Sequence, residues 1–235
     1  MIQLPEVPQP AWGWKEVVLS IALMLPAMIV GAILSYGAAW LLLGHAPSQV
    51  QIAIPSQMAS YALWLGGVWA IFRGLHLKLW DAVAWTWPAD GPWIYLAIGP
   101  VLALAAGLLA SLLQAKDIKN GLMEQLLSDP WGCRLLVLFG ITGAPLIEEL
   151  LFRGILLPVA VRSLGIVQGL LITAVPFSLM HGPMYDWSWQ HLLLLILVGI
   201  GFGLVRLRSQ STLAATITHG AYNLMMFAGH FVLNQ

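Results

Sequence analysis

Charged residues and cysteines are both scarce in this chain. Only 9% of its residues are charged and the formal net charge is zero, which argues against a nucleic-acid partner, because such partners are bound by basic surfaces. Cys133 is the single cysteine, so an intrachain disulfide and a cysteine-based zinc site are excluded. Apolar residues instead make up 60% of the chain. This composition predicts an integral membrane protein that is surrounded by the lipid bilayer.

Apolar segments of membrane-spanning length recur along the whole chain. By the criterion of about 20 residues per span, they fall at roughly 17–43, 57–73, 92–114, 131–160, 165–181, 190–207 and 212–233. The sequence therefore predicts an all-α fold, a polytopic transmembrane bundle of about seven spans (six to eight), in a single integral membrane domain over residues 1–235. It does not indicate an oligomeric state.

The basic residues favour one orientation in the membrane. With the N-terminus on the cytoplasmic side, that side collects Lys15, Arg73, Lys78, Arg162, Arg206 and Arg208, and the opposite side collects Lys116, Lys119 and Arg134. Cytoplasmic loops carry an excess of Lys and Arg. The first apolar run is too long for a cleavable signal peptide, so we expect a retained helix. We expect a multi-pass protein of the plasma (inner) membrane with a cytoplasmic N-terminus.

Two adjacent glutamates, Glu148 and Glu149, lie inside the fourth apolar segment. Carboxylates at membrane depth are costly unless they are paired, hydrated or used. On a helix, Arg153 shares a face with Glu149, while Glu148 points about 100° away. We therefore predict that Arg153 pairs with Glu149 and that Glu148 faces a cavity as a general base. Pro145 is expected in the first turn of a new helical segment, which lets water reach Glu148. The simpler alternative is a Glu–Arg pair that only joins two helices.

Two histidines in later segments add groups that are suited to acid–base chemistry. His181 follows Phe177 by four residues, and His219 precedes Asn223 by four residues. His219 and Asn223 share a helix face and can donate hydrogen bonds to a developing oxyanion. They can equally join helices as polar contacts. For His181, the alternative is an interfacial polar residue.

These motifs, in this order, resemble the pattern of the CAAX protease and bacteriocin-processing (CPBP, or Abi) family of intramembrane endopeptidases, which includes the type II CAAX prenyl endopeptidases. The family pattern is Glu-Glu-x-x-x-Arg, then Phe-x-x-x-His, then His-x-x-x-Asn. The chain carries it at Glu148-Glu149-Arg153, Phe177-His181 and His219-Asn223. The resemblance covers about residues 131–228, as a protease core within the membrane domain.

The resemblance implies hydrolysis of a peptide bond in a membrane-associated protein or peptide substrate. Carried over by position, Glu148 and His181 activate the attacking water, and His219 and Asn223 stabilise the oxyanion. Three further residues are implied to support the site: Glu149, Arg153 and Phe177.

Two matters remain open at the level of the sequence. A metal would have Glu148, His181 and His219 as ligands, and these could hold zinc. Because no His-Glu-x-x-His is present, we favour a glutamate that acts on water without a cofactor. The non-enzymatic alternatives are a membrane scaffold or bacteriocin-immunity protein, and a transporter, which would also place Glu and His in the bilayer.

Overall fold

The computed structural model describes residues 9–116, 118 and 121–233, and these residues form helices joined by turns. The predicted all-α fold is confirmed. The chain divides into two compact units. The motif unit, named for the three motifs that it carries, comprises Met1–Trp12, Trp80–Ile118 and Gly140–Gln235. The hairpin unit comprises Gly13–Leu79 and Lys119–Phe139. A single domain over the whole chain stays a prediction. Residues 1–8 and Lys119, which enter the orientation argument, lie outside the described residues.

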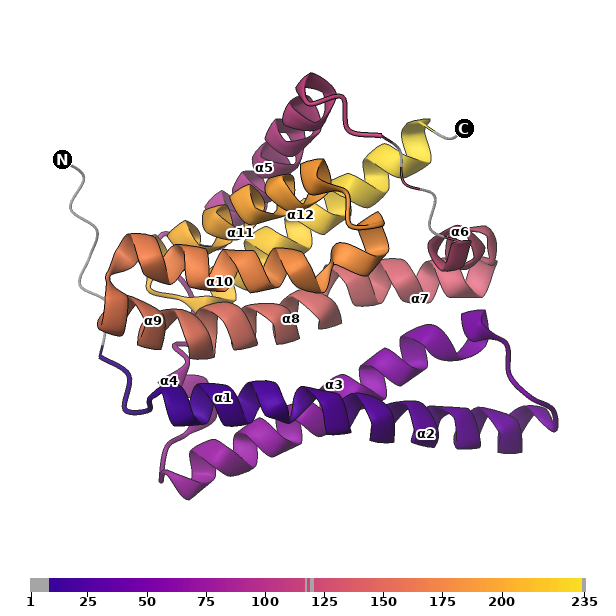
Figure 1. The fold of residues 1–235 in the computed structure, drawn as a ribbon, viewed down its shortest axis with the longest axis horizontal. Coiled ribbons are helices and arrows are strands. Elements are labelled where there is room, and N and C mark those ends of the chain that lie inside the picture. Colours follow the sequence, from indigo (N-terminus) through magenta and orange to yellow (C-terminus); the bar gives the residue numbers. More distant parts are fainter. Residues whose placement is uncertain (1–8, 117, 119–120, 234–235) are drawn as a thin grey trace. The chain divides into compact units, whose positions relative to one another are not determined.

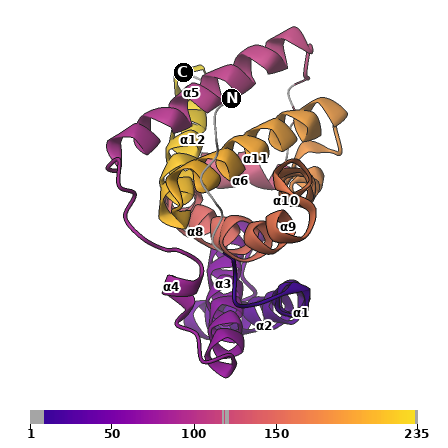
Figure 2. The same cartoon turned by 90° about the vertical axis from the view of Figure 1, so that its left-hand side faces the viewer.

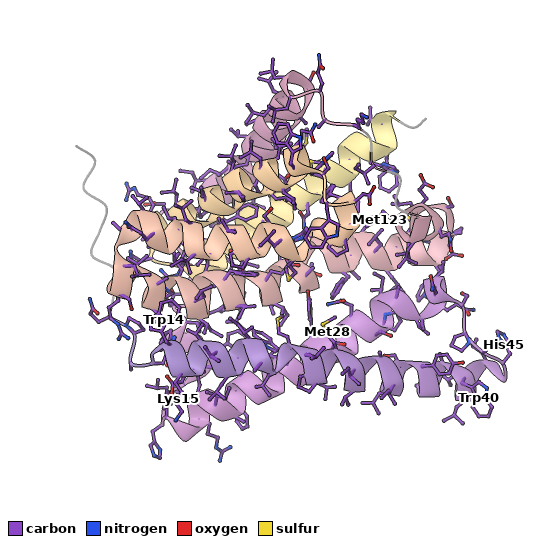
Figure 3. The ribbon with its side chains drawn as sticks, viewed as in Figure 1. Trp14, Lys15, Met28, Trp40, His45 and Met123 are labelled. Atoms are coloured by element: carbon purple, nitrogen blue, oxygen red, sulfur yellow. The ribbon has the colours of Figure 1, made fainter. Side chains whose placement is uncertain are left out.

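The hairpin unit is built on two long helical segments. Its helices are α1 (Trp14–Ala22), α2 (Met24–Leu43), α3 (Gln49–Gly74), α6 (Gly121–Ser128) and most of α7 (Pro130–Ile141). Together α1 and α2 run for 30 residues, which is about 45 Å at 1.5 Å per residue. Figure 1 shows α3 returning across them, and Figure 3 shows Trp14 and Lys15 at one end of this run and Trp40 and His45 at the other. Aromatic and basic residues at both ends of a long apolar helix suit the two interfaces of a bilayer.

The turn and the close packing of this hairpin follow from particular residues. α2 ends at Gly44, whose φ of 73° is a left-handed conformation that glycine adopts without strain. α3 begins with a capping box in which Ser48 and Gln51 exchange hydrogen bonds. At the crossing, a Cβ on Gly31 would lie only 2.6 Å from the backbone nitrogen of Ser60, so only glycine allows the two helices to approach this closely.

The motif unit gathers the remaining helices around the three motifs. They are α4 (Leu79–Ala82, of which Trp80 onwards belongs to this unit), α5 (Trp93–Leu112), α8 (Gly143–Glu149), η1 (Leu150–Leu156), α9 (Leu157–Leu164), α10 (Ile166–Met180), η2 (Gly182–Tyr185), α11 (Trp189–Ser209) and α12 (Thr212–Leu233). Figure 2 shows α5 against α12 and α9 beside α10. Gly99 allows α5 to lie this close to α12, because a Cβ there would lie 2.5 Å from the carbonyl oxygen of Thr218.

Four described helical segments are long and apolar enough to cross a membrane: Trp14–Leu43, Trp93–Leu112, Pro130–Leu164 and Trp189–Ser209. The apolar helix α10 is shorter. The multi-pass character is supported, but the predicted seven spans are not confirmed. Helices do occupy the other predicted segments, 57–73 within α3 and 212–233 as α12, yet neither counts as a span by length and composition. α12 falls short because its threonines, His219 and Asn223 make it more polar than a lipid-facing helix.

Candidate active site

The helix that carries the two glutamates changes its geometry directly after them. α8 begins at Gly143 after a break at Thr142, and Pro145 lies in its first turn, as predicted. Glu149 ends α8, and the next seven residues form the π-helix η1. The N–H of Leu157 accordingly bonds the carbonyl oxygen of Phe152, five residues earlier. Short π-helical stretches inside α-helices occur frequently at functional sites, and nothing in the amino-acid pattern had indicated one here.

Glu149 and Arg153 form a fully buried ion pair. Nη1 of Arg153 donates to Oε1 of Glu149 at 2.9 Å, and both side chains are 0% exposed. The predicted pairing is therefore confirmed. Nη2 of Arg153 donates to the carbonyl oxygen of Gly199 on α11 at 2.7 Å, so the arginine also fixes α11 against η1.

Three phenylalanine rings surround the guanidinium of Arg153. Its central carbon lies 4.8 Å from the ring centre of Phe177, 5.4 Å from that of Phe202 and 5.8 Å from that of Phe152. Aromatic faces attract cations, and more strongly where water is excluded. The rings therefore help to hold a charge in surroundings that would otherwise disfavour it. Phe177 was expected to support the site. Phe202 was not singled out by the sequence, because its spacing along the chain relates it to none of the three motifs.

His219 lies between the two glutamates. Its Nδ1 is 2.9 Å from Oε1 of Glu149, and its Nε2 is 3.9 Å from Oε2 of Glu148. A carboxylate that is paired with Arg153 is ionised and can only accept, so Nδ1 carries the proton. Nε2 is thereby directed at Glu148. The ring of Phe202 stacks on that of His219, with 4.5 Å between the ring centres, and keeps the imidazole in this plane.

Glu148 is buried, with 8% of its surface exposed. Its Oε2 has no hydrogen-bond partner among the described residues. The distance of 3.9 Å to His219 is too long for a direct hydrogen bond. This carboxylate oxygen is therefore buried without a donor in the described part of the chain, and a general base needs an oxygen that no other donor occupies.

His181 and Asn223 make their contacts with the backbone. Nδ1 of His181 is 2.8 Å from the carbonyl oxygen of Phe177; a carbonyl only accepts, so Nδ1 donates and the lone pair of the neutral ring is on Nε2. The ring of Phe177 contacts both His181 and His219, at 4.9 and 5.7 Å between ring centres. Nδ2 of Asn223 donates to the carbonyl oxygen of Gly140 at 2.7 Å. Neither residue forms a hydrogen bond or ion pair with Glu148 in the described part of the chain.

The donors present do not assemble into a metal site. Across residues 9–116, 118 and 121–233, no three side chains of His, Cys, Asp or Glu come together as metal ligands. Glu148, His181 and His219, the ligands that the zinc alternative required, are thus not grouped as three. Nδ1 of His219 is also occupied by Glu149, which leaves the nitrogen Nε2 for any other contact.

Comparison with known proteins places the three motifs within one family. Residues 130–225 match the family model described as type II CAAX prenyl endopeptidase Rce1-like. The matched range begins with α7 and contains all seven residues of the motifs. The searches of curated proteins and of solved structures returned no match for the chain.

Proposed function

Residues 130–225 belong to the Rce1-like type II CAAX prenyl endopeptidase family, a protease family, and on this ground we propose that the chain is an intramembrane endopeptidase. Its substrate is a membrane-associated protein or peptide. The observation that carries the proposal is the position of His219 inside the matched range, bonded to Glu149 and directed at Glu148. An acid–base pair held in one orientation by a buried carboxylate is typical of hydrolases.

Glu148 is the proposed general base. Its Oε2, which has no partner among the described residues, accepts a proton from a water molecule as the water oxygen attacks the carbonyl carbon of the scissile peptide bond. His181 assists through Nε2, which accepts a hydrogen bond from the same water. This assignment of His181 is supported by its tautomer, which the carbonyl oxygen of Phe177 fixes.

His219 and Asn223 are the proposed donors to the tetrahedral oxyanion. With Nδ1 held by Glu149, His219 in its protonated form presents Nε2–H toward the reaction centre, and the negative carboxylate stabilises that imidazolium. Asn223 uses one amide N–H for Gly140 and keeps the other as a donor. Donors that are fixed before the reaction stabilise developing charge without reorganisation.

The charges of the site allow one further proton. Glu148, Glu149 and Arg153 carry a formal charge of −1 when His219 is neutral, so a proton on Nε2 of His219 makes the cluster neutral and leaves Glu148 ionised as the base. A buried cluster is most stable near neutrality. During cleavage, the proton that Glu148 has taken from the water passes to the nitrogen of the leaving amine as the carbon–nitrogen bond breaks, and His219 keeps its own proton. The proposed chemistry needs no metal, and zinc remains the alternative.

We test the proposal with a peptide that ends in a prenylated CAAX motif with a free C-terminus and carries a fluorophore and a quencher on either side of the scissile bond. Purified protein in detergent is expected to cleave it, and Glu148→Gln is expected to reduce kcat at least about a thousandfold while the protein stays folded. Glu124→Gln is the matched control, since Glu124 is an exposed glutamate on α6. Cleavage by Glu148→Gln at the rate of the Glu124 control would refute the assigned mechanism.

We further propose that the protein resides in the plasma (inner) membrane with a cytoplasmic N-terminus. The distribution of Lys and Arg along the sequence supports this orientation. Reporter fusions after Lys78 and after Arg208 are expected to be active on the cytoplasmic side. Activity of either fusion on the opposite side contradicts the orientation.

A further inference from the structure

A second buried arginine, Arg206, lies in the last turns of α11 and has no acidic partner among the described residues. Its side chain is 3% exposed. Nε donates to Oγ1 of Thr212 at 3.0 Å, while Nη1 is buried and has no hydrogen-bond partner in the described part of the chain. A guanidinium stays charged and offers five N–H donors. Burying it unpaired is costly, and Arg153, which has Glu149, avoids that cost.

The surroundings of Arg206 fix its position without neutralising it. Oγ1 of Thr212 accepts from Arg206 and donates to the carbonyl oxygen of Val83 at 2.5 Å, and the N–H of Thr212 donates to the carbonyl oxygen of Ala84 at 2.9 Å. The loop after α4 is thereby tied to the start of α12. Each of these partners is uncharged. The guanidinium is therefore held in place with its charge unmatched.

Arg206 lies on the face of α11 that carries Phe202, and its partner Thr212 lies on the face of α12 that carries His219. It follows Phe202 by four residues, and its partner Thr212 precedes His219 by seven, so each pair shares a helix face. At about 1.5 Å per residue, these spacings are about 6 Å along α11 and about 10 Å along α12. Because Phe202 stacks on His219, the two helices are joined at the active site and again at Arg206.

We propose that Arg206 binds the C-terminal carboxylate of the peptide whose scissile bond lies at Glu148. This inference rests on the proposed function. A CAAX motif is the last four residues of a protein, so a substrate of that kind ends in a free carboxylate close to the motif. An extended chain covers about 3.3 Å per residue, so a peptide that runs along the two helices from the level of His219 to that of Arg206 spans this distance of about 6–10 Å with two or three residues.

A bound carboxylate would supply the negative counter-charge that Arg206 lacks. A guanidinium and a carboxylate form short, charge-assisted hydrogen bonds that are often bidentate. A peptide with a blocked C-terminus would leave the buried cation unmatched and would bind and react poorly. Arg206 thereby selects for peptide ends over internal segments. A lipid phosphate offers similar acceptor oxygens, so the experiment includes lipid as a separate arm.

The test compares two quenched peptides that differ only at the C-terminus, one a free acid and the other an amide. Wild-type protein is expected to cleave the acid with a kcat/KM at least about tenfold higher, as the loss of a charge-assisted hydrogen bond implies. In Arg206→Gln, the kcat/KM for the acid should approach that for the amide. Arg206→Lys should keep part of the wild-type preference for the acid. Arg208→Gln is the control, because Arg208 is exposed on the same helix, and it should keep the wild-type ratio.

The outcomes separate this inference from the proposed function. Equal cleavage of acid and amide by the wild type, or an unchanged preference in Arg206→Gln, overturns the inference and leaves the peptidase intact. Cleavage of neither peptide overturns both. Binding is measured in parallel with Glu148→Gln protein, in detergent with and without phosphatidylglycerol. If Arg206→Gln changes the retention of phosphatidylglycerol but not the affinity for the peptide acid, the occupant is lipid and the inference is wrong.

Discussion

Replacing Glu149 by glutamine is expected to destabilise the protein far more than the same change at Glu148. Oε1 of Glu149 accepts from Nη1 of Arg153 and from Nδ1 of His219, each at 2.9 Å, and the ion pair with Arg153 is 0% exposed. Glu148 has only the longer approach to His219, at 3.9 Å. The negative charge of Glu149 thus holds Arg153 and His219 in place, whereas that of Glu148 holds neither by a hydrogen bond.

The magnitude follows from these contacts. Glutamine keeps an acceptor oxygen, but the bond from His219 becomes a neutral one and falls from about 1.5–3 kcal/mol to about 0.5–1.5 kcal/mol. It also leaves Arg153 buried without its counter-charge, and breaking a buried ion pair costs about 3–5 kcal/mol in all. For Glu148→Gln we expect about 1 kcal/mol or less, because relief of the repulsion between neighbouring carboxylates offsets the lost attraction to His219.

Thermal unfolding of purified protein in detergent, followed by tryptophan fluorescence, measures the difference. For a chain of this size, 1 kcal/mol shifts Tm by about 2–4 °C, so a loss of 3 kcal/mol in Glu149→Gln lowers Tm by about 6–12 °C. Combining Glu149→Gln with Arg153→Met should recover part of the loss, since no unpaired charge then remains. A Tm for Glu149→Gln equal to that of wild type, with Glu148→Gln the unstable variant, would show that the roles of the two glutamates are reversed.

Three further predictions concern catalysis. Asn223→Ala should lower kcat about 10²–10³-fold, the usual effect of losing one oxyanion donor, with unchanged folded yield by size-exclusion chromatography; a kcat within threefold of wild type excludes Asn223 as a donor. Phe202→Leu should lower kcat more than it raises KM, because His219 loses the ring that orients it, and an effect confined to KM would instead place Phe202 in substrate binding. Exhaustive chelation should leave kcat unchanged, with the metal content measured in parallel; activity that is lost and then restored by stoichiometric zinc would establish a metalloprotease.

The sequence predicted the features of the site that depend on local spacing. Glu149 and Arg153 are four residues apart on a helical segment, and this periodicity alone brings them together. The break that places Pro145 in a first turn followed from proline chemistry. The helical segments were found at nearly their predicted positions, because long apolar runs indicate helices whether or not each one crosses a membrane.

Contacts between distant segments could not be obtained in this way. His219 and Glu149 are 70 positions apart, and Asn223 and Gly140 are 83 apart. The i, i+4 spacing of His219 and Asn223 indicated a shared face but not that Glu149 would bind the first of them. Pairing of Glu148 with His181 remains a proposal. The seven predicted spans also remain unconfirmed, because four of the described helical segments are long and apolar enough to cross a membrane.

The π-helix η1 changes the direction in which the faces of the following helix point, relative to those of the preceding helix. A π-turn takes up about one residue more than an α-turn, which rotates the faces of the following helix by about 100° relative to those of the preceding one. α8 can therefore present its glutamates to α12 while α9 packs Leu157 and Val161 into the core with Leu170. One continuous α-helix would bring only one of these faces into register. The number of residues in this stretch thus matters as much as their identity, and a deletion of one residue between Leu150 and Leu156 would turn either the charges or the core face away from its partners.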